Sequence, residues 1–245
     1  AFAAARGLDP GKATIGLLTN VFWDAQLHYR QNAFRDMLEW MVKTIEWFRL
    51  RPDLQLLIRI HPAEIRGTVK SRQMLADEIV RAIPDLPANV FVIPPENPVS
   101  TYAAMLKCDS VIIYGTKMGV ELTSVGIPVI VAGEAWIRNK GLTLDASTED
   151  EYFRILGRLP FRGRLDALAV AEARKYAYHF FFRRMLPLPF VAPMDRAPNF
   201  RLDVSSLADL LPGVHPGLDV ICDGILNPTC PFIYEAERLG LHDAS

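Results

Sequence analysis

The amino-acid sequence predicts an α/β fold, a doubly wound parallel sheet followed by a helical C-terminal extension. Over the first 133 residues, short apolar runs suited to buried strands alternate with stretches of helical spacing. Apolar strands that alternate with helices are typical of a parallel sheet covered on both faces. After Gly133 the alternation stops, and helical and proline-rich segments follow.

Five strands are predicted, because each of the apolar runs is short and bounded by turn residues or by a helical pattern. They are residues 14–19 (TIGLLT), 54–60 (LQLLIRI), 89–95 (NVFVIPP), 110–115 (SVIIYG) and 127–133 (IPVIVAG). Helices are predicted between them, over about 34–48, 65–83, 100–108 and 116–126. Pro52 follows the first helix, Pro84 ends the second and Gly126 closes the last.

The sequence after Gly133 predicts further helices on both sides of an extended, proline-rich stretch. A helix is expected over 147–156, with Ser147 as its N-cap and acidic residues in its first turn. A long helix is expected over about 164–185, then an extended segment rich in proline, then a short helix at LDVICDGIL. The sequence therefore predicts a Rossmann-like domain over residues 1–145. Residues 146–245 are expected to form a helical wrap that packs on it.

Composition narrows the class of protein. With 245 residues, of which 50% are hydrophobic, the chain can bury a sizeable core. A net charge of −1 gives no electrostatic footprint for nucleic acid. Cys108, Cys222 and Cys230 lack metal-ligand spacing and suggest a reducing compartment. No apolar run approaches the ~20 residues of a membrane span, and AFAAA is too short for a signal peptide. The sequence begins with alanine rather than methionine, so processing or excision from a longer polypeptide is expected.

Polar and aromatic residues follow each predicted strand. In open α/β sheets ligands bind at the carboxyl ends of the strands, so this edge is the predicted site. The residues there are Asn20, Trp23 and Asp24 after the first strand, His61 and Glu64 after the second, Glu96 after the third, Tyr114, Gly115, Thr116 and Lys117 after the fourth, and Glu134, Trp136, Arg138 and Lys140 after the fifth.

The strongest local signal is the passage from the fourth strand into a helix through Gly115, Thr116 and Lys117. Free N–H groups at a helix start, together with the lysine charge, suit a phosphate. Gly119 would allow close approach to the backbone, and Glu121 could accept hydrogen bonds from ribose hydroxyls. The alternative is a tight turn in which Thr116 is only the N-cap and Glu121 is merely exposed. The stretch is neither a Walker A loop nor GxGxxG.

His61 is held at the end of its strand by Pro62, which fixes the exit of the chain. Its imidazole could donate a hydrogen bond to a phosphate or act as general acid to a leaving group. The alternative is a partly buried structural histidine. Arg59 is expected to neutralise Glu64 or another acid. Asp24 is the candidate carboxylate for acid–base chemistry, with helix capping as the alternative.

Two groups of aromatic residues each allow two interpretations. Trp23 and Trp136 could stack on a base or sugar, or serve as core or lid residues. The stretch KYAYHFFFRR combines aromatic residues with basic ends. It is interpreted as a core helix, with contact to a lipid surface as the alternative.

Taken together, the segments from "FWDAQ" to "GLTLD" resemble the capsule polysaccharide biosynthesis family, which includes the bacterial β-Kdo transferases. Two elements in order carry the resemblance: RIHPAE, and GTKMGVE followed by GIPVIVAG, which matches the pattern G(S/T)xxGxE…GxPVI…G. The similarity runs from about residue 14 to residue 186, with weaker agreement in LDVICDGIL.

The resemblance implies the C-terminal half of a GT-B glycosyltransferase. Its donor would be a nucleotide-activated sugar, CMP-Kdo in the Kdo branch, used in capsular or surface polysaccharide synthesis. His61 and Thr116 would meet the nucleotide phosphate and Glu121 the ribose. No metal or cofactor is expected, because backbone N–H groups and basic side chains take the charge of the leaving group. The candidate catalytic residues are His61 and Asp24, and the candidate donor-binding residues are Asn20, Trp23, Arg59, His61, Glu64, Tyr114, Gly115, Thr116, Lys117, Gly119, Glu121 and Trp136.

Two departures from the family pattern affect what the chain would do alone. The usual pair of small hydroxyl residues is here Gly115–Thr116, followed by Lys117. Only one Rossmann-like unit is present, so the acceptor site and the catalytic base would lie on a missing N-terminal GT-B domain.

The expected partners are a nucleotide-sugar donor and a glycan or glycolipid acceptor, and no nucleic acid. The expected location is the cytoplasm, including peripheral association with the inner face of the membrane. Three other functions stay open: a sugar-nucleotide 2-epimerase, a non-catalytic nucleotide-binding module, and a polyol-phosphate transferase with a CDP-alcohol donor.

Overall fold

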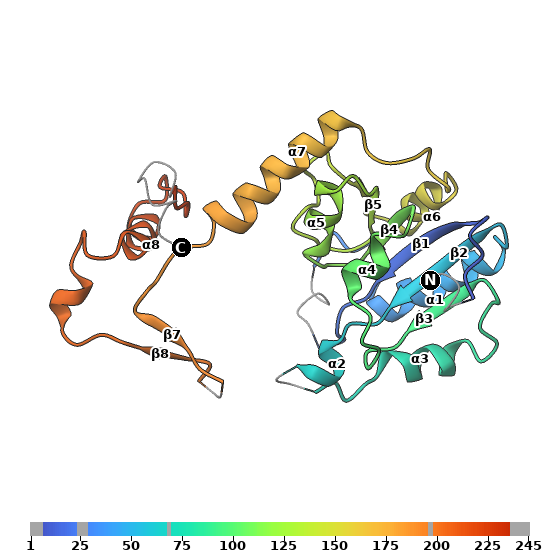
Figure 1. Cartoon of the computed structure of the whole chain (residues 1–245), viewed down its shortest axis with the longest axis horizontal. Coiled ribbons are helices and arrows are strands. Elements are labelled where there is room, and N and C mark those ends of the chain that lie inside the picture. Colours follow the sequence, from blue (N-terminus) through green and yellow to red (C-terminus); the bar gives the residue numbers. More distant parts are fainter. Residues whose placement is uncertain (1–6, 24–28, 68–69, 196–197, 236–245) are drawn as a thin grey trace. The chain divides into compact units, whose positions relative to one another are not determined.

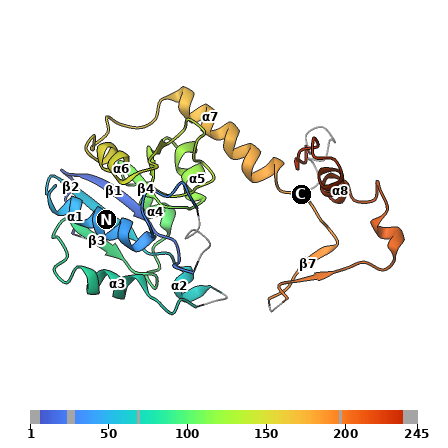
Figure 2. The same ribbon diagram turned by 180° about the vertical axis from the view of Figure 1, so that it is seen from behind.

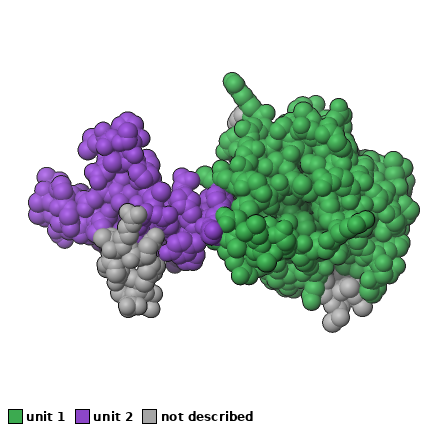
Figure 3. All heavy atoms as spheres, turned by 90° about the horizontal axis from the view of Figure 1, so that it is seen from above, with its two compact units in different colours: residues 1–174 green, residues 175–245 purple. Residues whose placement is uncertain are grey.

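The computed structural model describes residues 7–23, 29–67, 70–195 and 198–235. The chain divides into two compact units, Ala1–Arg174 and Lys175–Ser245, which Figure 3 shows in different colours. The first unit contains the large sheet and the candidate site. No helix among the described residues is both long enough and apolar enough to cross a membrane.

The first unit is built on a parallel sheet of six strands with the order β3-β2-β1-β4-β5-β6 (Figure 1). All five predicted strands are confirmed, and the sheet adds a sixth. The strands are β1 (Ala13–Leu18), β2 (Leu54–Arg59), β3 (Val90–Ile93), β4 (Ser110–Ile113), β5 (Val129–Val131) and β6 (Leu144–Asp145). β6 was not predicted, because two residues are too short to produce a periodic signal.

The order of the strands reverses between β1 and β4. From β1 the chain moves outward through β2 and β3, and from β4 it moves the other way through β5 and β6. Leu17 of β1 is in register with Ile58 of β2 on one side and with Ile112 of β4 on the other. Such a reversal leaves a crevice at the carboxyl ends of the two central strands.

Helices cover both faces of this sheet, as the opposite views of Figures 1 and 2 show. Those of the first unit are α1 (Met37–Arg49), α2 (Ala63–Arg66), α3 (Leu75–Ala82), α4 (Thr101–Met105), α5 (Met118–Ser124) and α6 (Glu149–Leu156), and α7 (Ala167–Tyr178) crosses into the second unit. The helix expected over 65–83 is instead two, because the chain turns extended at Gly67 (ψ 159°) and α3 begins only at Leu75.

Alternation along the strands decides which helix covers which face. Ile15 and Leu17 are fully buried in one core with side chains of α1, α3 and α6. Gly16, between them, faces α4, and a Cβ there would lie 2.6 Å from Met105 Sδ. Successive side chains of a strand point to opposite faces. The sheet is therefore covered as a doubly wound fold requires.

The first compact unit includes β6, which pairs with β5, and α6, whose Tyr152 and Leu156 are buried in its core. The expected N-cap of α6 was wrong by one residue. Thr148 is the cap and accepts a hydrogen bond from Glu151 N, whereas Ser147 Oγ accepts one from Arg138. The division at residue 145, with residues 146–245 as a wrap that packs on the first domain, stays a prediction.

The long helix expected over 164–185 is shorter: α7 spans Ala167–Tyr178 and continues in the second unit as a π-helical turn, η3 (His179–Arg183). The proline-rich stretch forms an antiparallel pair, β7 (Val191–Pro193) and β8 (Phe200–Leu202). A short 3₁₀ helix, η4 (Leu207–Leu210), precedes α8 (Pro216–Leu226), which confirms the helix predicted at LDVICDGIL.

Candidate functional site

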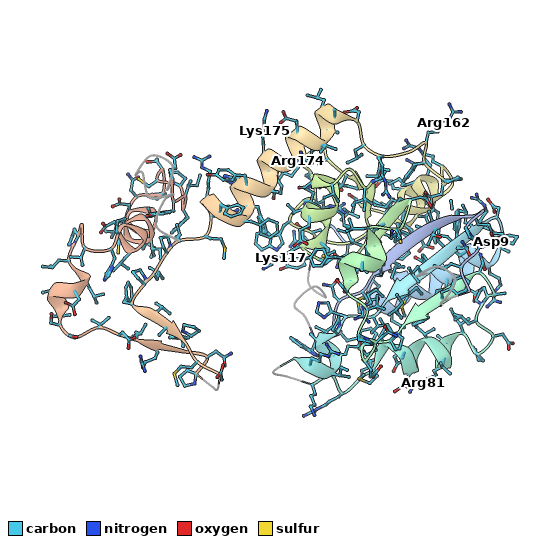
Figure 4. The ribbon with its side chains drawn as sticks, in the orientation of Figure 1. Asp9, Arg81, Lys117, Arg162, Arg174 and Lys175 are labelled. Atoms are coloured by element: carbon cyan, nitrogen blue, oxygen red, sulfur yellow. The ribbon has the colours of Figure 1, made fainter. Side chains whose placement is uncertain are left out.

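A cleft of about 630 Å³ lies at the carboxyl edge of the sheet. A volume of this size is typical of small-molecule sites. Lys117 is at this edge, and Asp9 is at the opposite edge, near the starts of the strands (Figure 4). The cleft is lined by Asn20, Tyr29, His61, Gly115, Thr116, Lys117, Glu134, Ala135 and Trp136.

The turn between β4 and α5 forms one side of the cleft. Asn20 Oδ1 accepts a hydrogen bond from Gly115 N at 3.2 Å, so the ends of β1 and β4 are joined across the reversal of strand order. Thr116 Oγ1 accepts from Met118 N at 3.3 Å, which engages this hydroxyl in the turn. Lys117 is exposed, and its ammonium forms no ion pair with the described residues. The turn thus presents to the cleft a positive charge that no described residue compensates by an ion pair.

His61 lies at the cleft from the end of β2, and its orientation is fixed. The imidazole Nδ1 accepts a hydrogen bond from Ala63 N at 3.0 Å, and the backbone N–H of His61 donates to Thr19 Oγ1 at 3.1 Å. A neutral imidazole whose Nδ1 accepts carries its proton on Nε2. Protonation of Nδ1 would break the bond from Ala63. The geometry therefore favours His61 as a hydrogen-bond donor rather than as a general acid.

Three predicted donor-binding residues are buried away from the cleft surface. Arg59 donates to the carbonyl oxygens of Pro94, Asn97 and Val99 at 2.6–3.4 Å, which ties β2 to the segment after β3. Tyr114 packs against Trp40, with ring centroids 5.1 Å apart, and burial raises its pKa to about 12. These side chains support the sheet edge and do not line the cleft.

Glu64, the third of them, is 1% exposed and accepts a hydrogen bond from Leu75 N at 3.2 Å. This contact joins α2 to the first residue of α3. Burial, with smaller effects from the charges of Glu96 and Asp77, raises the pKa of the Glu64 carboxyl to about 7. The group therefore titrates near neutrality although it lies outside the cleft lining.

Gly119 and Glu121 do not contribute to the cleft surface, although the sequence suggested that they would contact the ligand. A Cβ on Gly119 would lie 2.7 Å from Ile113 Cδ1 and 2.9 Å from Ile137 Cγ2, so this glycine admits neighbouring side chains rather than a ligand. Glu121 is half-buried on α5 and does not line the cleft. A hydrogen bond with the Glu121 carboxylate raises the pKa of the Tyr102 hydroxyl on α4.

The two remaining predicted residues lie on the segment after β1. Trp23 is 52% exposed and donates from Nε1 to Ser71 Oγ at 3.1 Å, but it does not line the cleft. Asp24 lies outside the described residues. Its proposed roles in acid–base chemistry or capping therefore stay predictions.

The structure adds Tyr29 and Ala135 to the cleft lining. It also places Glu134 there, which was expected at this edge from its position after the fifth strand but was given no role. Tyr29 belongs to a loop without periodicity, and only the fold brings it to the edge of the sheet.

Arg138 holds the loop that carries the β5 side of the cleft. It is 3% exposed and donates to Gly133 O at 3.1 Å, Ala146 O at 3.0 Å and Ser147 Oγ at 2.7 Å. Its Nε donates to Gln31 Oε1 at 3.1 Å. One buried guanidinium thus joins both ends of the loop to each other and to the segment after β1.

Among the described residues, no group of three or more His, Cys, Asp or Glu side chains could hold a metal ion. The described residues that line the cleft offer hydrogen-bond donors and acceptors, the ammonium of Lys117, the carboxylate of Glu134 and the aromatic side chains of Tyr29 and Trp136. Such a set can bind and orient a polar, partly anionic ligand.

Comparison with protein families gives a match to the model for the capsule polysaccharide biosynthesis protein over residues 6–177. No curated protein matches the chain in sequence.

Among solved structures, the chain is similar to two KpsC structures from Thermosulfurimonas dismutans. The β-Kdo 2,4 transferase has 17% identity and a TM-score of 0.42, over 68% of this chain and 45% of that one. The β-Kdo 2,7 transferase has 17% identity and a TM-score of 0.42, over 80% and 51%. A UDP co-structure of MnaA from S. aureus has 12% identity and a TM-score of 0.44, over 70% and 46%. The chain spans about half the length of these structures.

Proposed function

The chain belongs to the family of capsule polysaccharide biosynthesis proteins, and from this premise we propose that it is the donor-binding domain of a glycosyltransferase. The proposed donor is CMP-Kdo, and the acceptor is a growing glycan or glycolipid of a capsular or surface polysaccharide. The proposed location is the cytoplasm, at the inner face of the membrane where a lipid-linked acceptor would lie. The proposed partner is an N-terminal GT-B domain that supplies the acceptor site.

The observation that carries the proposal is the polar cleft at the reversal of strand order. Lys117 brings a charge without an ion-pair partner among the described residues, and the Nε2 proton of His61 makes that nitrogen a donor. Both residues line the cleft beside the Gly115–Thr116 turn. A nucleotide phosphate would receive charge-assisted hydrogen bonds from them, which are stronger than neutral ones.

In the proposed reaction the bond between the sugar and the phosphate oxygen breaks, and an acceptor hydroxyl forms the new glycosidic bond. Negative charge then increases on the departing nucleotide phosphate. Lys117 and His61 would stabilise that charge, as preorganised donors do in transition states. The acceptor proton would pass to a base assigned to the partner domain, and the residues of this chain would bind and orient the donor.

The first test is calorimetric titration of this chain with CMP, CDP, UDP and ADP under identical conditions. We expect CMP to bind most tightly, because the proposed donor is a cytidine monophosphate sugar. A preference for UDP would overturn the donor assignment. Failure of all four nucleotides to bind would overturn the donor-binding function of this chain.

His61 is tested by two substitutions that separate its contacts. His61→Ala removes both the acceptor for Ala63 N and the Nε2 donor. We expect it to weaken CMP binding by about 5- to 150-fold, or roughly 1–3 kcal/mol, as for loss of a hydrogen bond to a charged group.

His61→Asn is the matched variant, because its amide oxygen can still accept from the Ala63 N–H but its side chain is too short to replace Nε2. It should keep the thermal stability of the unsubstituted protein and still lose CMP affinity. Unchanged affinity in either folded variant would remove His61 from the phosphate site.

Turnover separates transfer from the other functions. The chain is assayed in its full-length protein with CMP-Kdo, with and without a glycan acceptor. We expect CMP release that depends on the acceptor. Interconversion of a sugar nucleotide without any acceptor would instead identify an epimerase.

A further inference from the structure

The cleft contains two opposite charges that do not neutralise one another. Lys117 follows β4 and Glu134 follows β5, the neighbouring strand. Among the described residues, neither side chain forms an ion pair, and the Glu134 carboxylate accepts no hydrogen bond. Glu134 is half-buried, but its carboxylate oxygens are not among the buried side-chain atoms without a partner that the described residues contain, so they stay accessible. A ligand with hydroxyl groups can donate hydrogen bonds to them.

The backbone beneath Glu134 is held rigidly. Glu134 N donates to Asn32 Oδ1 at 3.0 Å, and Arg138 donates to Gly133 O at 3.1 Å. Gly133 packs so closely on Tyr114, the residue after β4, that a Cβ would lie 2.6 Å from Tyr114 O. The backbone that carries the Glu134 carboxylate is therefore fixed at one side of the cleft. A site whose backbone is already ordered loses less conformational entropy when it binds a ligand.

Trp136 lies two residues further along the same wall and lines the same cleft with 53% of its surface exposed. An indole face beside a carboxylate acceptor is the combination that suits a ring with an apolar face and hydroxyl groups on its rim. The carboxylate would at the same time repel a second phosphate.

The cleft is long enough to separate these functions. Its lining residues follow four adjacent strands, in the order β2, β1, β4 and β5. Three inter-strand spacings of about 4.8 Å give a span of about 14 Å. His61 lies at one end of this span and Glu134 and Trp136 at the other, with Lys117 between them.

We propose that Glu134 and Trp136 form a subsite for the neutral, hydroxyl-bearing side of a sugar ring, next to the phosphate position at Lys117 and His61. This inference rests on the proposed function and deepens it. The ring is either the ribosyl group or the transferred sugar of a nucleotide sugar, and both offer the same chemistry. A sugar with a carboxylate, such as Kdo, would turn its hydroxyl groups rather than its carboxylate toward Glu134.

The test compares Glu134→Ala and Trp136→Ala with the unsubstituted chain by calorimetric titration against CMP, CMP-Kdo and inorganic phosphate. Glu134→Ala should weaken binding of CMP-Kdo at least 10-fold and strengthen binding of inorganic phosphate a few-fold at low salt, because a repulsive charge is removed. Trp136→Ala should weaken binding of CMP-Kdo and leave that of phosphate unchanged. Asp150→Ala, an equal charge change on α6 outside the cleft, should alter neither.

The pattern across ligands assigns the ring. A loss of affinity for CMP as large as the loss for CMP-Kdo identifies the ribosyl group, and a loss confined to CMP-Kdo identifies the transferred sugar. Binding of CMP-Kdo that is equal in the unsubstituted chain and in both variants would overturn the subsite but leave the proposed function standing. Failure of the unsubstituted chain to bind any nucleotide would overturn both.

Discussion

Replacing Arg138 by methionine should lower the free energy of unfolding by about 2–4 kcal/mol, because buried carbonyl oxygens would lose their donors. The guanidinium donates to the carbonyls of Gly133 and Ala146 and to Ser147 Oγ, and it is 3% exposed. Methionine fills a similar volume but donates nothing. Lysine should not rescue the loss, since a single ammonium cannot reproduce the planar fork of an arginine.

Chemical denaturation monitored by fluorescence measures this effect. Arg162→Met is the matched control, because Arg162 is exposed on the first unit (Figure 4) and the same substitution there should change stability by less than about 0.5 kcal/mol. Equal stability of the two variants would show that the loop is not held by Arg138. If the loop is held as described, Arg138→Met should also weaken ligand binding, since Glu134 and Trp136 lie on it.

Glu64 should make the protein less stable as the pH rises. Burial raises the pKa of its carboxyl to about 7 in the folded state, from an ordinary value of 4.5. Between these two values the folded state binds more protons than the unfolded state, so stability is lost as the pH increases through this window. A shift of this size corresponds to about 2–3 kcal/mol between pH 4.5 and pH 8.

Glu64→Gln should abolish most of that dependence, because the amide oxygen still accepts from Leu75 N and carries no charge. We expect the variant to be more stable than the unsubstituted protein at pH 8 and about equal to it at pH 5, in urea denaturation at both pH values. Asp77→Asn is the control. Its charge makes only a small contribution to the shift, so most of the dependence should persist. If the free energy of unfolding changed with pH equally in Glu64→Gln and in the unsubstituted protein, Glu64 would not be the source of the pH dependence.

The sequence predicted the architecture well where strands are long and apolar. Each of the five predicted strands is present, and helices follow four of them as expected, although one predicted helix is two. The elements that the sequence did not predict correctly are short or irregular. β6 has two residues, and Gly67 turns extended where helical spacing appeared to continue. Periodicity reports burial over many residues, so it cannot detect elements fixed by one or two contacts.

For the site, position in the chain identified the edge but not the direction of each side chain. Asn20, His61, Thr116 and Lys117 line the cleft as predicted from their place after strands. Arg59 and Glu64 lie in the same short stretch as His61, yet both side chains are buried and form hydrogen bonds with backbone groups. Successive side chains of a strand point to opposite faces of the sheet. Which polar group a buried charged side chain then meets depends on segments distant in the sequence.

The sequence by itself determined which segments form buried strands and that polar residues cluster at the carboxyl ends of these strands. The first follows from local periodicity, and the second follows because parallel strands all end at the same edge of the sheet. Only the tertiary structure decided that Tyr29 reaches the cleft, that Arg138 holds its wall, and that the charges of Lys117 and Glu134 remain apart. These depend on contacts between residues roughly a hundred positions apart, such as Arg138 with Gln31 and Gly115 with Asn20. Such contacts form only when the sheet brings the ends of its strands together, and no local pattern encodes them.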